Sequence, residues 1–195
     1  MTNSGGADTS LPATLILLYS VTYNANGSTS GTVPTDETTY ASGDQVTVKT
    51  NSGSLARTGY SFAGWNLKSD GTGTSFTPGS GKFTMSSGDA TIYAKWTLDN
   101  YAISYVIDAS PYSGTPASYN VESTTFNLPV PTKAGYLFSG WYGTSDLNGS
   151  KITSIAKGST GNKTFYAKWT PENYSITYSI DGVAYSGTPT SYTIE

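Results

Sequence analysis

Stretches of alternating apolar and polar residues recur along most of this chain. In "TIYAKWT", residues 91–97, Ile92, Ala94 and Trp96 share one side of an extended chain, and the Thr, Tyr and Lys residues share the other. Side chains of a β-strand point alternately to its two faces, so this pattern predicts a strand with an apolar face on a core and a Lys-bearing face in water. The same period of two appears at residues 46–49 and 101–106.

The chain also repeats itself, with a unit of roughly 70 to 80 residues. "GYSFAGW" at 59–65 returns as "GYLFSGW" at 135–141, and "YAKWT" at 93–97 returns at 166–170. The last stretch, 174–195, repeats the phrase that begins at Tyr101. We predict an N-terminal extension with an apolar strand-like run at 1–18, a first repeat at 19–98, a second repeat at 99–171 and a partial third copy at 172–195.

Helical periodicity is scarce in every copy. Only brief stretches such as "TSIAKGST", residues 153–160, fit a helix. Gly59, Gly64, Gly135 and Gly140 bracket the aromatic motif, and we expect them to allow a bulge or a close backbone approach. The pattern therefore predicts a mainly β protein, α+β with minimal helix, having at most one short helix or helical turn per copy.

The repeats are joined by very short connections. Only "TLDN" separates Trp96 from Tyr101, and only "TPEN" separates Trp169 from Tyr174. Four residues span at most roughly 14 Å, so successive repeats are expected to touch or nearly touch. We predict a semi-rigid, elongated array.

Composition removes several classes of function. The 195 residues contain no Cys and no His, which excludes disulfides, thiolate nucleophiles, Ser-His catalysis and nearly every zinc site. Charged residues make up 12% of the chain, and its net charge of -3 with scattered Lys and Arg argues against nucleic acid. No apolar run approaches the roughly 20 residues that span a bilayer, so no membrane insertion is expected.

The two linked aromatic motifs resemble those of a known family. "GYSFAGWN" with "FTMSSGDATIYAKWT", and "GYLFSGWY" with "YAKWT", closely resemble the Listeria-Bacteroides repeat, which includes the B repeats of internalin-type surface proteins. The resemblance covers about 19–97 and 101–170, with part of a third copy. It implies small β-grasp-like modules with a mixed sheet, in tandem stalks or adhesive repeats of extracellular bacterial proteins, and no catalytic residues or cofactor. The first repeat departs from the pattern by an insert around residues 38–58.

The motif aromatics have two interpretations. Exposed Trp and Tyr rings can stack on sugars, whereas a module of this size needs large side chains simply to fill its core. We favour the core interpretation because each Trp occupies a repeated position on an alternating face. The predicted core residues are Tyr60, Phe62, Trp65, Ile92, Trp96, Tyr136, Phe138, Trp141 and Trp169.

A second set of aromatic residues falls on the opposite, Lys-bearing side of the strands. These residues are candidates for an exposed contact face, or else they pack across strands beneath the Lys stems. They are Tyr93, Lys95, Tyr166 and Lys168. The carboxylates, such as Asp36 with Glu37, are dispersed in turn-like contexts and are expected at the surface, so no calcium loop or other metal site is predicted.

The run Leu15, Ile16, Leu17 and Leu18 lacks alternation, which is typical of a strand covered on both faces. The partial third copy offers about two strands without the rest of their sheet. Strand exchange between neighbouring chains could satisfy both, giving a head-to-tail fibre. The alternative is that the partial copy simply belongs to a longer array.

Together these observations predict a non-enzymatic repeat protein. We expect a secreted or cell-surface bacterial protein that serves as a structural stalk or adhesion segment, with partners among its own copies or host or cell-surface proteins and glycans. The main alternative is a carbohydrate- or receptor-binding module that uses exposed aromatics.

Overall fold

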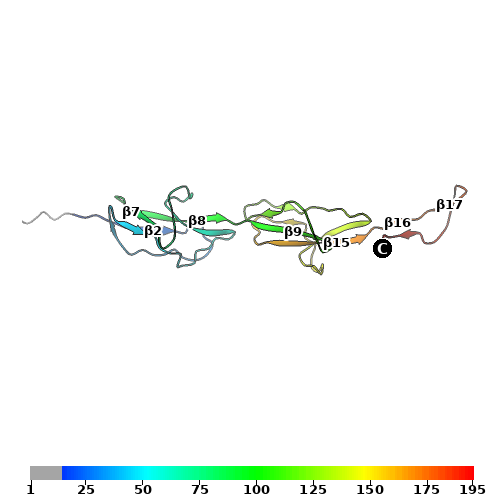
Figure 1. The fold of residues 1–195 in the computed structure, drawn as a ribbon, viewed down its shortest axis with the longest axis horizontal. Coiled ribbons are helices and arrows are strands. Elements are labelled where there is room, and N and C mark those ends of the chain that lie inside the picture. Colours follow the sequence, from blue (N-terminus) through cyan, green and yellow to red (C-terminus); the bar gives the residue numbers. More distant parts are fainter. Residues whose placement is uncertain (1–14) are drawn as a thin grey trace, which may run out of the picture. The chain divides into compact units, whose positions relative to one another are not determined.

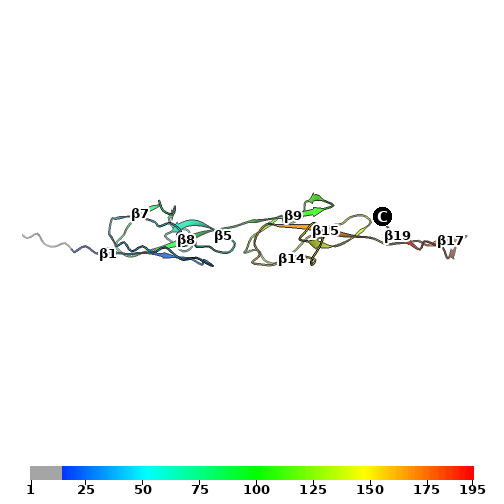
Figure 2. The same ribbon diagram turned by 90° about the horizontal axis from the view of Figure 1, so that it is seen from below.

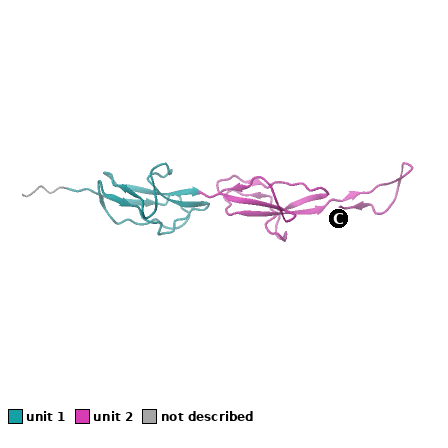
Figure 3. Ribbon diagram, viewed as in Figure 1, with its two compact units in different colours: residues 1–97 teal, residues 98–195 magenta. Residues whose placement is uncertain are grey.

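The computed structural model describes residues 15–195. These divide into two compact units, with the boundary between Thr97 and Leu98 (Figure 3). Each unit is described by itself. No helix occurs in the described residues, so "TSIAKGST" forms a short strand and turns in place of a helical turn. The prediction of a mainly β fold is confirmed.

The first unit carries the first repeat. Its strands are β1 Leu18–Tyr19, β2 Val21–Asn24, β3 Tyr40–Ala41, β4 Gln45–Thr47, β5 Tyr60–Asn66, β6 Ser75–Phe76, β7 Lys82–Thr84 and β8 Ala90–Leu98. The main sheet has the order β2-β8-β5-β6, and the pairs β1-β3 and β4-β7 complete the unit. Strands β2 and β8 run parallel (Figure 1), whereas β5 and β6 are antiparallel.

The second unit carries the second repeat and the partial third copy. Its strands are β9 Tyr101–Ile107, β10 Ser110–Tyr112, β11 Ser118–Tyr119, β12 Phe126–Asn127, β13 Tyr136–Tyr142, β14 Ser154–Ile155, β15 Lys163–Pro171, β16 Tyr174–Ser175, β17 Tyr178–Ile180, β18 Val183–Tyr185 and β19 Ser191–Tyr192. The main sheet has the order β10-β9-β15-β13, and β11 also pairs with β9. Strand β15 is parallel to β9 and antiparallel to β13 (Figure 2).

The two repeats bury the same aromatic motif. Trp65 is 0% exposed and Trp141 is 1% exposed, and each is at the centre of a separate core. The Trp65 indole Nε1 donates to the Lys49 carbonyl at 2.8 Å, and the Trp141 Nε1 donates to the Pro129 carbonyl at 2.7 Å. A buried indole N–H needs such an acceptor. Each Trp therefore fills its core and also holds in place the segment that follows β4 or β12.

Glycine precedes each of these tryptophans for a steric reason. Gly64 has φ 114°, and a Cβ there would lie 2.6 Å from the Phe76 carbonyl oxygen. Gly140 has φ 142° and follows a bulge in the pairing of β13 with β15. The predicted bulge and close approach are both confirmed, because an L side chain fits neither backbone.

The insert of the first repeat contributes to its core. The stretch 38–58 supplies β3, β4 and the core residues Val46, Val48 and Leu55. Its counterpart in the second repeat supplies β12 and Leu128. Both repeats contain the mixed sheet that the resemblance implies, and the β-grasp likeness stays a prediction.

Candidate functional site

The partial third copy forms a hairpin that reproduces the start of the second repeat. Strand β17 pairs with β18, and β16 pairs with β19, both antiparallel. The Tyr178 hydroxyl donates to the Pro189 carbonyl at 2.9 Å, and the Tyr174 and Tyr192 rings stack with centroids 5.3 Å apart. In the second repeat, the Tyr105 hydroxyl donates to the Pro116 carbonyl at 3.1 Å. The local sequence therefore builds the same hairpin twice.

The two hairpins differ in what covers them. In the second repeat, residues Lys163–Tyr166 of β15 pair in parallel with Ile103–Val106 of β9, on the edge opposite β10. This cover leaves Tyr105 and Tyr119 each only 3% exposed. In the partial third copy, β17 pairs only with β18 among the described strands. Tyr192, the counterpart of Tyr119, is 55% exposed, and Ile180 is 57% exposed. Strand β18 is exposed throughout, as its counterpart β10 is.

The base of this hairpin is held against the end of the second repeat. The Glu172 N–H donates to the Gly135 carbonyl at 2.9 Å, and the Tyr136 hydroxyl donates to Glu195 Oε1 at 3.1 Å. That bond to Glu195 raises the pKa of Tyr136. A Cβ on Gly135 would lie 2.7 Å from Ile194, so the glycine lets the two segments approach. The joint between the second repeat and the partial third copy is therefore a packed contact.

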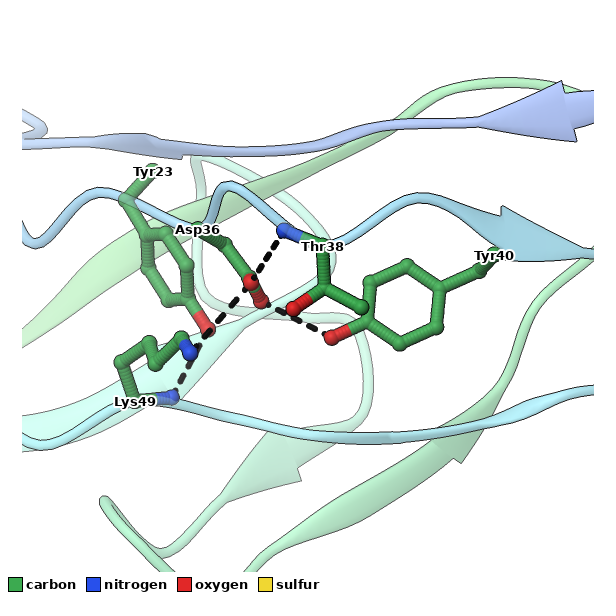
Figure 4. Close-up of polar contacts among 5 residues, drawn as sticks. All are labelled: Tyr23, Asp36, Thr38, Tyr40 and Lys49. Atoms are coloured by element: carbon green, nitrogen blue, oxygen red, sulfur yellow. Dashed lines mark hydrogen bonds and ion pairs between the residues drawn. The ribbon is translucent and has the colours of Figure 1, made fainter.

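The first repeat contains a buried carboxylate that sequence patterns place at the surface. The side chain of Asp36 is 0% exposed and lies 3.3 Å from Lys49 Nζ. The Tyr40 hydroxyl donates to Asp36 Oδ2 at 3.0 Å and the Thr38 N–H to Oδ1 at 3.2 Å (Figure 4). Asp36 thus ties the loop after β2 to the segment after β4.

Electrostatics keep this carboxylate ionised. Burial raises the pKa of Asp36, but the hydrogen bonds from Thr38, Tyr40 and Lys49 outweigh it and hold the pKa below its ordinary range. Beside it, the Lys49 N–H donates to the Tyr23 hydroxyl at 2.8 Å. The pKa of Tyr23 is raised, mainly by burial. The cluster is therefore a charged brace between the loop after β2 and the segment after β4, with Asp36 enclosed and the Lys49 side chain 41% exposed.

Comparison with known proteins fixes the family. The profile of the Listeria-Bacteroides repeat domain matches residues 19–95 and 101–168. The chain belongs to the Listeria-Bacteroides repeat family. The two matched stretches coincide with the two aromatic cores, so the resemblance drawn from the motifs is confirmed.

Relatives of these Listeria-Bacteroides repeats occur in much longer proteins. The chain is 32% identical, over 85% of its length, to a protein of Evansella cellulosilytica whose name describes a Gly-rich membrane protein, and it covers 20% of that protein. Internalin H of Listeria monocytogenes is 32% identical over 57% of this chain, which covers 19% of the internalin. The chain therefore spans about a fifth of the length of these curated relatives.

The predicted strand-exchange run lies in the open. Leu15, Ile16, Leu17 and Leu18 are 84%, 64%, 62% and 57% exposed. Only Leu18 joins a strand, pairing with Ala41 of β3. No second layer lies over this run among the described residues, and its cover by a neighbouring chain through strand exchange stays a prediction. The rest of the predicted extension, 1–14, lies outside the described residues.

The predicted core residues occupy three environments in these Listeria-Bacteroides repeats. Trp65, Trp141 and Ile92 are fully buried, whereas Phe62, Trp96, Phe138 and Trp169 are partly buried against the cores. Tyr60 and Tyr136 lie outside both core clusters. They begin β5 and β13, beyond the end of each core, and lie under the cations of Arg57 and Lys133 at 3.9 and 4.2 Å from the ring centres. Placing these two tyrosines in the core is therefore wrong.

The predicted contact face is only partly open. Tyr93 and Tyr166 are half-buried. Lys95 Nζ donates to Ser75 Oγ at 2.7 Å, and Lys168 Nζ lies 5.4 Å from the Tyr142 ring centre. The face therefore combines packing with exposure, and its role as a contact surface stays a prediction.

The described residues contain no group of three or more acidic side chains placed to hold a metal ion. Across residues 15–195, no helix has the length and hydropathy to cross a membrane.

Proposed function

We propose that the chain is a structural, non-catalytic segment of a bacterial cell-surface protein, in which tandem repeats space or present other parts of the molecule. Family membership supports this role, and so does the internalin among the relatives. Each repeat has its own aromatic core, which suits a repeated spacer because a repeat then depends little on its neighbours for folding.

The finer part of the proposal is assembly through the open hairpin. The pairing of β15 with β9 shows what kind of strand could cover the open hairpin. Strand β15 runs parallel to β9, pairs with it over four residues and lies on the edge away from β10. An unpaired strand edge with exposed apolar side chains is a template for strand addition. In the partial third copy, the matching stretch is residues 176–179, whose second half lies in β17.

The same chain carries a suitable donor. Leu15–Leu18 has four uncharged, exposed residues, as many as the paired stretch of β15. We assign this run of a neighbouring copy as the strand that covers β17. Repetition of that contact joins copies head to tail, since donor and acceptor lie on different parts of the chain.

The test is the mass of the full chain in solution as a function of concentration, measured by light scattering and sedimentation velocity. The wild-type chain is expected to grow in mass with concentration. Replacing Leu15, Ile16 and Leu17 together by Ser should abolish this growth without unfolding the first repeat, because all three side chains are exposed.

A matched control removes equally exposed apolar side chains elsewhere. Val130 is 76% exposed and Leu137 is 56% exposed, so the Val130→Ser and Leu137→Ser double variant should still assemble. A peptide with the sequence of residues 163–171, the covering strand, should compete with assembly. A wild-type chain that stays monomeric at every concentration would remove the assembly proposal and leave the spacer role intact.

A further inference from the structure

A polar pocket of about 220 Å³ lies in the first repeat, apart from the open hairpin. It is lined by Asn26, Arg57, Lys95, Trp96 and the turn at Ser69–Gly71. We call it the Arg57 pocket. Its volume is below the roughly 300–1,000 Å³ of sites for drug-sized ligands, so it suits a small polar group.

The walls of the Arg57 pocket are held by their own hydrogen bonds. The Asn26 amide Nδ2 donates to the carbonyls of Ser69 and Ala94, both at 2.8 Å. The Trp96 Nε1 donates back to the Asn26 carbonyl at 3.0 Å. These bonds join two turns and β8, so the pocket is formed before any ligand arrives.

The charges in the Arg57 pocket favour an anion. Arg57 lies over the Tyr60 ring, 3.9 Å from the ring centre, and lines the pocket with its guanidinium. Lys95 supplies a second cation, held by Ser75. Asp70 is the opposing carboxylate of the lining, and it already accepts bonds from the Thr72 N–H at 2.9 Å and hydroxyl at 2.7 Å.

The second repeat carries an internal ion pair at the equivalent place. Asp108 occupies the position of Asn26, with φ 50° against 48°, and Lys133 occupies the position of Arg57. Lys133 Nζ and Asp108 Oδ2 form an ion pair at 2.8 Å. Asp108 thus neutralises the cation of the second repeat, whereas the amide of Asn26 has no charge with which to neutralise Arg57.

We propose that the Arg57 pocket binds the oxyanion of an acidic sugar unit, with the carboxylate or phosphate on Arg57 and Lys95. The planar guanidinium matches the two oxygens of such an anion. The turn carbonyls and Asp70 accept hydrogen bonds from sugar hydroxyls, and the polar lining excludes a purely apolar ligand. The chain then contacts an acidic glycan through its first repeat and not its second.

The test is a titration of the ¹⁵N-labelled full chain, followed by the NMR signals of the Trp96 indole N–H and the Arg57 Nε–H. Glucuronate is expected to give saturable shifts at these signals. Glucose 6-phosphate distinguishes the source of the oxyanion: saturation by either acid supports the proposal. Equal shifts with neutral glucose, or equal binding of inorganic phosphate alone, would overturn it.

Variants make the assignment to Arg57 specific. Arg57→Ala should weaken binding by at least about tenfold, because it removes a charge-assisted hydrogen bond. Arg57→Lys should bind with intermediate affinity. Lys133→Ala is the matched control in the second repeat and should bind like the wild type. Unfolding curves establish that all three variants fold, and a folded Arg57→Ala variant with unchanged affinity would contradict the proposal.

Discussion

The first and second repeats fill their cores in the same way and brace them differently. Both bury a Trp after a Gly and bond its indole to a backbone carbonyl at the same point of the fold. Around that shared centre, the first repeat has the buried Asp36 brace, whereas the second has the β9–β10 hairpin and the exposed Lys133–Asp108 pair. The aromatic motif therefore specifies the fold, and the loops are where copies acquire separate properties.

The largest expected effect tests the shared core. Trp65→Ala and Trp141→Ala should each reduce the stability of their own repeat by about 3–5 kcal/mol, since both leave a cavity at a fully buried site. Hydrogen exchange by mass spectrometry reports the two repeats separately in the full chain. If Trp65→Ala loosened both repeats equally, the separation into two cores would be wrong.

The next effect belongs to the first repeat alone. Asp36→Ala leaves the Tyr40 hydroxyl and the Thr38 N–H without their acceptor, and should cost about 1–3 kcal/mol. Asp108→Ala is the matched control, because it also removes an aspartate paired with a lysine but from an exposed site. Denaturant unfolding should show a clear shift for the first variant and a much smaller one for the control. Equal shifts would contradict the distinction between a buried and an exposed pair.

Asp36 also makes the stability of the first repeat depend on pH. Its pKa is lower in the folded chain than in the unfolded chain, so its contribution is fully present above the unfolded value of about 3.9. That contribution is lost as the pH falls further, through the folded pKa. The difference in unfolding free energy between wild type and Asp36→Asn should therefore shrink below about pH 4.

The comparison with Asp36→Asn is necessary because other carboxylates also respond to acid. Hydrogen bonds lower the pKa of Asp70 and of Asp89 in the same repeat, and both remain in the variant. An unfolding difference that stayed constant from pH 7 to pH 3 would show that Asp36 is not held ionised by its partners.

The sequence predicts the parts of this fold that depend on local pattern. Period two in "TIYAKWT" correctly predicts that Ile92 and Ala94 face the core, where both are 0% exposed. The repeated glycine before Trp65 and Trp141 correctly predicts an irregular backbone. Such features are readable because each is determined by residues within one strand.

Features that depend on distant contacts are not readable in this way. Asp36 looks like a surface turn residue beside Glu37, and it becomes buried only because Lys49 and Tyr40 converge on it from later in the chain. Conversely, Leu15–Leu18 has the composition of a buried strand but receives no cover. The repeated aromatic motif also cannot show where a core ends, and Tyr60 and Tyr136 lie outside both core clusters.

The smallest expected effect distinguishes Trp96 from Trp169, which occupy the same position in the repeated "YAKWT" motif. Trp96 Nε1 donates to the Asn26 carbonyl at 3.0 Å, whereas Trp169 Nε1 is buried without a partner in the described structure. Trp96→Phe loses that hydrogen bond, worth about 0.5–1.5 kcal/mol, in addition to packing. Trp169→Phe loses similar packing but relieves an unsatisfied donor.

The Trp96→Phe variant should therefore be the less stable of the two relative to wild type, by about that hydrogen-bond energy. Because the substitution is identical in both repeats, the common loss of ring area cancels in the comparison. Repeat-resolved hydrogen exchange measures the difference. A Trp169→Phe variant that is destabilised as much as Trp96→Phe would mean that the Trp169 indole N–H is satisfied in solution, and that the two repeats brace this edge of their cores alike.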